Sequence, residues 1–237
     1  LTRRDLATPS QANADWAWWA WLEPVQLAWN GSIDQLHTPN VQADRVAFTG
    51  QWNAPELKLE NLHVDLYERA LDASARVEVA TRQAEADCRF DFDVYRVAGL
   101  LTPKARTWLS QYTWQQPPEV NGQIRVTLPA WTNAHPDWRG EVQPTLRLDG
   151  FFRGRDAFYR GVPISTAQSH FTFSNQVWHL PDFVATRPEG RLEFAHWADS
   201  KTRDYWFDLR GQIDPQVIRP LVPAPQQKAF ELFQFTE

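Results

Sequence analysis

The sequence predicts a mainly β protein, with curved antiparallel sheet(s) built from repeated strand–strand–short-helix units and a few short helices. Many segments alternate apolar and polar residues with a period of two, as half-buried strands do. The helical patterns between them are short, which argues against parallel βαβ units. The order strand, strand, helix also recurs along the chain, which indicates a stacked repeat.

The first expected element is a helix over residues 9–22, in a stretch rich in tryptophan. Thr8 offers a capping hydroxyl, Pro9 suits the first helical position, and Gln11 stands three residues after the cap. The helix ends before Pro24, because the residue preceding a proline avoids helical angles.

From about Val25 onward the pattern predicts strands. Residues 86–94 alternate apolar with polar side chains over nine positions, and the alternation slips near Glu60, where we expect a turn or bulge. Further alternating segments predict strands at residues 74–81, 190–196 and 204–210, and a hairpin at residues 171–180.

The repeat is detected by comparing the chain with itself. Residues 76–80 match residues 191–195 at an offset of 191 − 76 = 115, and a second strand and a helix follow each copy. We expect these helices at residues 104–111 and 225–233. The resulting organisation is a Trp-rich helix and linker (1–30), a first β unit (31–130), and a second β unit truncated at its C-terminus (131–237).

Segments at residues 148–154, 159–165, 168–173, 178–181, 187–192 and 213–215 resemble those of a known family. The resemblance is to the C-terminal region of AsmA-like proteins of the bacterial cell envelope, the AsmA and TamB type. It covers most of the chain after residue 40 and follows a diffuse pattern, with no catalytic signature.

The resemblance implies a function. AsmA-like proteins support outer-membrane biogenesis and phospholipid transport between membranes through an apolar β-groove. It therefore implies a non-enzymatic, membrane-associated module in the periplasm, whose parent chain is anchored in the inner membrane. The implied partners are phospholipid acyl chains and flanking repeats of the same parent chain. The family brings no catalytic residue and no cofactor.

The candidate lipid groove is the apolar phase of the alternating strands, because such strands have one apolar and one polar face. The same side chains would form an ordinary core if the helices at 104–111 and 225–233 closed over them. The candidates are Val77, Val79, Phe90, Phe92, Val94, Phe171, Phe173, Leu192, Phe194, Tyr205, Phe207 and Leu209.

A search for chemistry favours structural roles. No pair among the six histidines has the spacing of a helical zinc site, and we expect His170 and His179 to form a cross-strand polar pair. Asp91 and Asp93 belong to the solvated face of an alternating strand, and Cys88 belongs to its apolar face, where a thiol packs inertly. We therefore predict no metal site.

Composition narrows the partners further. A formal net charge of −5 argues against nucleic acid, whose phosphates need a basic face. The absence of an 18-residue apolar run predicts no membrane span within this segment. Two alternatives to a lipid module stay open, namely a glycan-binding domain that uses exposed tryptophans and a purely structural β-domain of an envelope or surface protein.

Overall fold

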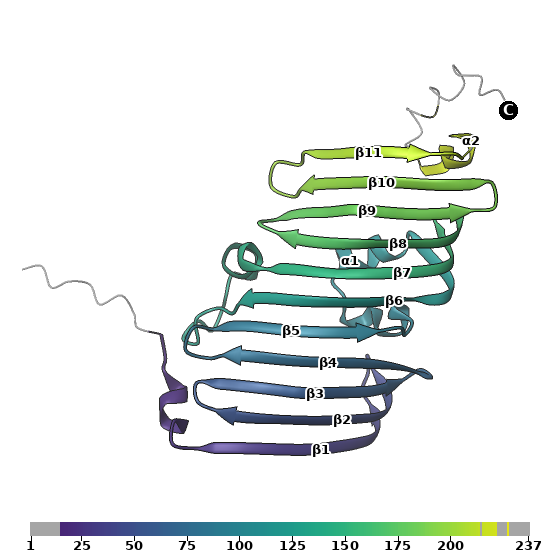
Figure 1. The fold of residues 1–237 in the computed structure, drawn as a ribbon. Coiled ribbons are helices and arrows are strands. Elements are labelled where there is room, and N and C mark those ends of the chain that lie inside the picture. Colours follow the sequence, from purple (N-terminus) through teal and green to yellow (C-terminus); the bar gives the residue numbers. More distant parts are fainter. Residues whose placement is uncertain (1–14, 214, 222–226, 228–237) are drawn as a thin grey trace, which may run out of the picture.

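The computed structural model describes residues 15–213, 215–221 and 227 and confirms the mainly β class. Figure 1 shows one open antiparallel sheet of eleven strands in sequence order, with β1 and β11 as its two edges. The strands are β1 (Gln26–His37), β2 (Gln42–Asn53), β3 (Glu56–Leu66), β4 (Arg69–Glu78), β5 (Gln83–Phe90), β6 (Tyr112–Thr127), β7 (Arg147–Tyr159), β8 (Val162–Ser174), β9 (Val177–Arg187), β10 (Gly190–Asp199) and β11 (Tyr205–Gly211).

Short helical segments lie near the ends of the strands, and α1 lies behind the curved sheet in Figure 1. The helix expected at 104–111 is α1, which begins where Thr102 Oγ1 accepts a hydrogen bond from Ala105 N. The segments are η1 (Trp18–Leu22), η2 (Val94–Leu100), α1 (Pro103–Leu109), η3 (Trp138–Val142), η4 (Gln143–Thr145), α2 (Pro215–Ile218) and η5 (Arg219–Leu221).

Two expected helices are only partly within the described residues. The described end of the stretch 9–22 forms the single 3₁₀ segment η1, and residues 9–14 lie outside the description. All of 225–233 except residue 227 also lies outside it.

Tight turns explain why the strands follow one another in order. Asn175 and Gln176 have φ of 51° and 66°, so they form the mirror-image turn that suits a twisted hairpin. This confirms the expected hairpin as β8 and β9. Tyr67 and Glu68 join β3 to β4 with similar angles, φ of 53° and 63°. Local pairing of this kind produces a meander.

Bulges keep the pattern of faces intact. Leu59 pairs with Ala75 and Leu62 pairs with Ala73, so Glu60 and Asn61 form the irregularity expected there. Without it, a three-residue step would move Leu62 to the opposite face from Leu59.

One side of the sheet is apolar from edge to edge, because residues paired across antiparallel strands share a face. We call this side the apolar face and its opposite the polar face. The register joins its side chains into rows across the strands. The row that defines the apolar face from β2 to β7 is Val46, Val64, Leu71, Phe90, Val120 and Phe152.

A packed cluster covers the apolar face at one end of the first strands. Ala43, Val64, Leu66 and Phe92 are buried there, and Val94 at the start of η2 packs against them. The connection between β5 and β6 therefore acts as a local lid on this corner.

A tryptophan cluster occupies the other end of the same strands. The Trp18 ring stacks on Trp52 at 5.8 Å between centroids and meets Trp131 edge-on at 6.0 Å. Trp52 Nε1 donates to the Leu22 carbonyl, and Trp131 Nε1 donates to the carbonyl of Val79, which is only 2% exposed. Two of the three indole N–H groups in this cluster, those of Trp52 and Trp131, therefore have a backbone partner.

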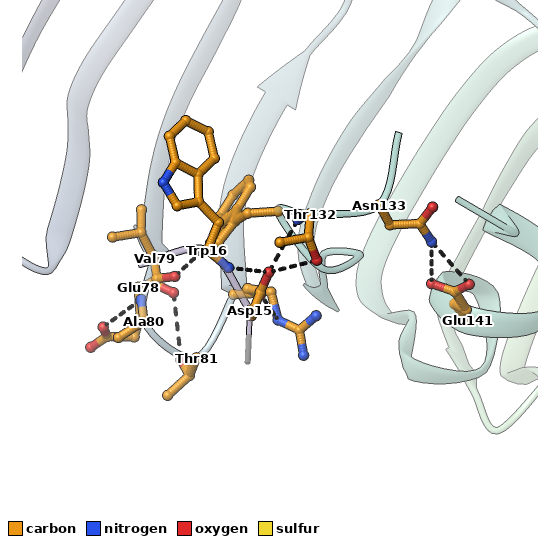
Figure 2. A network of polar contacts seen from close by, with 11 residues as sticks. Asp15, Trp16, Glu78, Val79, Ala80, Thr81, Thr132, Asn133 and Glu141 are labelled. Carbon is orange, nitrogen blue, oxygen red and sulfur yellow. Dashed lines mark hydrogen bonds and ion pairs between the residues drawn. The ribbon is translucent and has the colours of Figure 1, made fainter. Parts of the chain in front are cut away.

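Asp15 fastens the segment before η1 to this end of the sheet, as Figure 2 shows. Its Oδ1 accepts hydrogen bonds from the backbone and the hydroxyl of Thr132, in the loop between β6 and β7. Its Oδ2 lies 3.5 Å from Nε of Arg82, in the β4–β5 turn. One carboxylate thus links three segments that are distant in the sequence.

The two strands of the repeat recur, but their register does not. β4 and β5 precede η2 and α1, and β10 and β11 precede α2. α2 is not the helix expected in the second copy, because that helix, 225–233, lies outside the described residues except for residue 227. Residues 76–78 end β4 and residues 79–80 follow it, however, whereas 191–195 lie near the start of β10. The two strands start 190 − 69 = 121 residues apart instead of 115, so the matched letters at 76–80 are not structural equivalents. The boundary expected at residue 30 also falls inside β1.

We predict that Gly150→Ala lowers the free energy of unfolding by about 1–3 kcal/mol, because the new Cβ would overpack the sheet. It would stand 2.4 Å from the Asn121 carbonyl oxygen and 2.5 Å from Cζ of Phe171. Gly154→Ala, on the same strand, is the matched control, since its Cβ would meet nothing nearer than 3.8 Å. Urea unfolding of both variants measures the difference, and equal losses would contradict this account.

Candidate functional site

The apolar face is open away from its packed ends. Leu57 and Ile124 are 37% exposed and Trp178 is 40% exposed, whereas Val64 under η2 is 8% exposed. The strands pack against their neighbours in the sheet, and the described residues form no second sheet opposite them. Large apolar side chains therefore meet solvent along a face that an ordinary core would bury.

Small residues form a low strip across the middle of this face. They are Ala73, Cys88, Gly122 and Gly150, which are paired one after another from β4 to β7. The row containing Phe90 and the row containing Ile124 flank this small-residue strip on its two sides. At β8 the strip meets the Phe171 ring, which lies against Gly150. The Phe171 ring therefore occupies part of the space that the absent side chain of Gly150 leaves open.

Nine of the twelve predicted groove residues lie in strands, on the apolar face. Tyr205, Phe207 and Leu209 are the most exposed of these, at 71%, 55% and 55%, and Phe173 is buried at 4%. The others are Val77, Phe90, Phe171, Leu192 and Phe194.

The remaining three candidates do not lie in strands. Strand β5 ends at Phe90, so Phe92 and Val94, expected in a strand, instead belong to the packed cluster under η2. The alternation fails there because Asp93 Oδ1 accepts a hydrogen bond from Tyr95 N and begins η2. Val79 follows β4 and is sealed beneath the tryptophan cluster.

Sequence reasoning missed part of the face. Val120, Ile124 and Val126 on β6 and Leu148 on β7 occupy its centre. The alternation of Val120, Gly122, Ile124 and Val126 was the available signal, but glycine obscures an apolar pattern. His196 also lies on this face, where its ring stacks on Phe207 at 4.3 Å.

The polar face carries charges that neutralise one another across strands. Glu85 lies between Arg76 and Arg125, with closest contacts of 3.2 and 3.5 Å. A hollow of about 560 Å³ opens on this face, and no aromatic side chain lines it. Asp72 and Asp149 are among its acidic residues.

The titratable groups on the polar face form pairs. A hydrogen bond to Asp72 raises the pKa of His63, and Asp65 adds to this effect. His170 bonds Asp182 at 2.6 Å, so the expected pair of His170 with His179 is wrong. Burial would raise the pKa of Asp182, but the hydrogen bonds from His170 outweigh burial and lower it.

The cysteine and the acidic residues singled out in the sequence have these surroundings in the structure. Burial raises the pKa of the Cys88 thiol, which disfavours the reactive thiolate. Asp91, expected on a strand, lies beyond β5 and pairs with Arg69 at 3.0 Å. Within the described ranges, no three His, Cys, Asp or Glu side chains gather as metal ligands would. No helix in the described part is long and apolar enough to cross a membrane.

Three comparisons, with protein-family models, with curated proteins and with solved structures, find no match to this chain. The resemblance to AsmA-like proteins therefore stays a prediction.

We predict that Ile124→Asp lowers the free energy of unfolding by about 1 kcal/mol, because a carboxylate on the open face stays hydrated. Val64→Asp, on the same face but under η2, buries an unpaired charge and should cost about 3 kcal/mol or more. Guanidinium unfolding of the two variants checks this contrast. Large losses for both would mean that the whole face is sealed.

Proposed function

We propose that this chain is a non-enzymatic module of a bacterial envelope protein that binds phospholipid acyl chains on its apolar face. The observation that carries the proposal is the continuity of this face across the sheet together with its exposure at Leu57, Ile124 and Trp178. The placement in the envelope rests on the resemblance to AsmA-like proteins alone.

The physical reason is the free energy of the uncovered apolar surface. Each Å² removed from water yields about 25 cal/mol, and each buried methylene of a lipid yields about 0.8 kcal/mol. An acyl chain is flexible and featureless, so it can lie along an exposed apolar face that has no deep pocket. It needs no hydrogen-bonding partner from the protein.

The dimensions also suit acyl chains. Ten spacings between eleven strands, at about 4.8 Å each, make a face about 48 Å long across the strands. One leaflet of a bilayer core is about 15 Å thick, so the face is several times longer than one leaflet. It is therefore long enough to hold more than one acyl chain in succession, as intermembrane transport requires.

A second candidate function is glycan binding, favoured by the hollow on the polar face. Carboxylates and amides such as Asp87 and Asn121 line it and could bond sugar hydroxyls. A sugar site also needs exposed aromatic rings for stacking, and the hollow has none in its lining. We therefore favour the apolar face.

The test places a photo-reactive benzoylphenylalanine at Ile124, on the apolar face, or at Gln123, on the polar face. The full chain is irradiated with vesicles of phosphatidylethanolamine and phosphatidylglycerol, and mass spectrometry detects adducts. We expect a phospholipid adduct from position 124 and none from position 123. Equal adducts from both would indicate unspecific contact with the vesicle surface and overturn the proposal.

Filling the face should then block binding. We predict that Ala86→Phe, beside the small-residue strip, reduces the adduct at position 124 severalfold while unfolding stays similar to that of the wild type. Asp87→Phe is the matched control, because the next residue on β5 points to the polar face and should leave the adduct unchanged. An undiminished adduct in the Ala86→Phe variant would place the lipid elsewhere.

A further inference from the structure

The edge strand β11 is unusually apolar on both faces. Trp206 is 54% exposed on the polar face, and Phe207 and Leu209 are each 55% exposed on the apolar face. Edge strands in soluble proteins usually carry features that prevent pairing with another strand. At β1, by contrast, a left-handed residue, Gln35 with φ of 56°, interrupts the edge.

The hydrogen-bond pattern shows which groups of β11 face outward. Asp199 N donates to the Asp204 carbonyl, and Gln212 N donates to the Arg191 carbonyl. Even-numbered residues of β11 therefore bond to β10, because the alternation has a period of two. Tyr205, Phe207 and Leu209 consequently direct their backbone N–H and C=O groups away from β10, to the side where the described residues place no further strand.

The described chain after β11 does not run along this edge. Leu221, the last residue of η5, accepts a hydrogen bond from Nη1 of Arg160 at 3.2 Å. Arg160 lies in the turn between β7 and β8, so the chain has returned toward the interior of the sheet.

We propose that β11 pairs antiparallel with β11 of a second copy of this chain, with Phe207 opposite the partner's Phe207. The two-fold axis stands perpendicular to the sheet, so both apolar faces lie on the same side. The two sheets then form one of 2 × 11 = 22 strands. This proposal does not depend on the binding of lipid.

Charge complementarity selects the register. With Phe207 on the axis, Asp204 faces the partner's Arg210, and symmetry repeats this pair. Tyr205 faces the partner's Leu209, which extends the apolar row across the junction. Opposite charges and apolar pairs directly across two strands are the favourable combinations.

The two neighbouring registers with the same hydrogen-bond phase are worse. With Asp208 on the axis, this carboxylate faces the partner's Asp208. With Trp206 on the axis, Asp204 faces the partner's Asp208. Like charges directly opposite each other destabilise a strand pair, so of these three registers only the one centred on Phe207 avoids repulsion.

Disulfide trapping tests both the pairing and the register. In a Cys88→Ala background, which removes the chain's only cysteine, Phe207→Cys should give a covalent dimer under mild oxidation. The Cα separation of a hydrogen-bonded antiparallel pair, about 5.5 Å, suits a disulfide. Trp206→Cys and Asp208→Cys are matched controls that report the neighbouring registers and should give no covalent dimer. Trapping of a control in place of Phe207→Cys would overturn the register.

Charge exchange tests the same contact with Phe207 intact. Sedimentation should show self-association of the wild-type chain, which Asp204→Arg or Arg210→Asp weakens about tenfold, because each substitution creates two like-charge pairs. The double variant should restore the wild-type dissociation constant. Circular dichroism checks that each variant folds. A wild-type chain that stays monomeric at every concentration, or a double variant without rescue, would overturn the proposal.

Discussion

The structure depends on one constraint, which is that a single-layered sheet buries neither of its faces. Backbone hydrogen bonds between neighbouring strands hold the sheet together, and side chains support one another mainly along rows such as Val64, Leu71 and Phe90. Each strand depends on its two neighbours, as units of a repeat array do. A single-layered sheet offers the apolar rows no second layer to pack against. Burial of these rows would therefore need an external ligand, as proposed above.

The packed clusters at the two ends of the first strands bury the apolar face locally. At one end η2 closes over Val64 and Leu66, and at the other the ring of Trp18 closes against Trp52. In both clusters the covering side chains come from segments outside the strands, so they cover the corners and leave the middle of the face exposed. The corners of the face therefore stabilise the sheet by packing, whereas its middle stays exposed.

Sequence alone predicted the class, the main strands and α1, because a period of two and a Pro-opened helix are strong local signals. It failed where two local signals compete. At Phe92 the alternation continues, yet capping of η2 by Asp93 ends the strand. Pairing could not be predicted either. His170 meets Asp182 because β8 and β9 change register between Gln168 and Thr172, and such a shift leaves no mark in the composition.

The meander order also bears on how the chain acquires its shape. Each strand pairs with the next in sequence, so most contacts close short loops and cost little entropy. Hairpins can therefore form one after another as the chain leaves the ribosome, without waiting for its far end. The connections at residues 91–111 and 128–146 are the two long loops between strands. They divide the stepwise addition of hairpins into stages. An open sheet built in this way can lengthen by further hairpins without any change to those already formed.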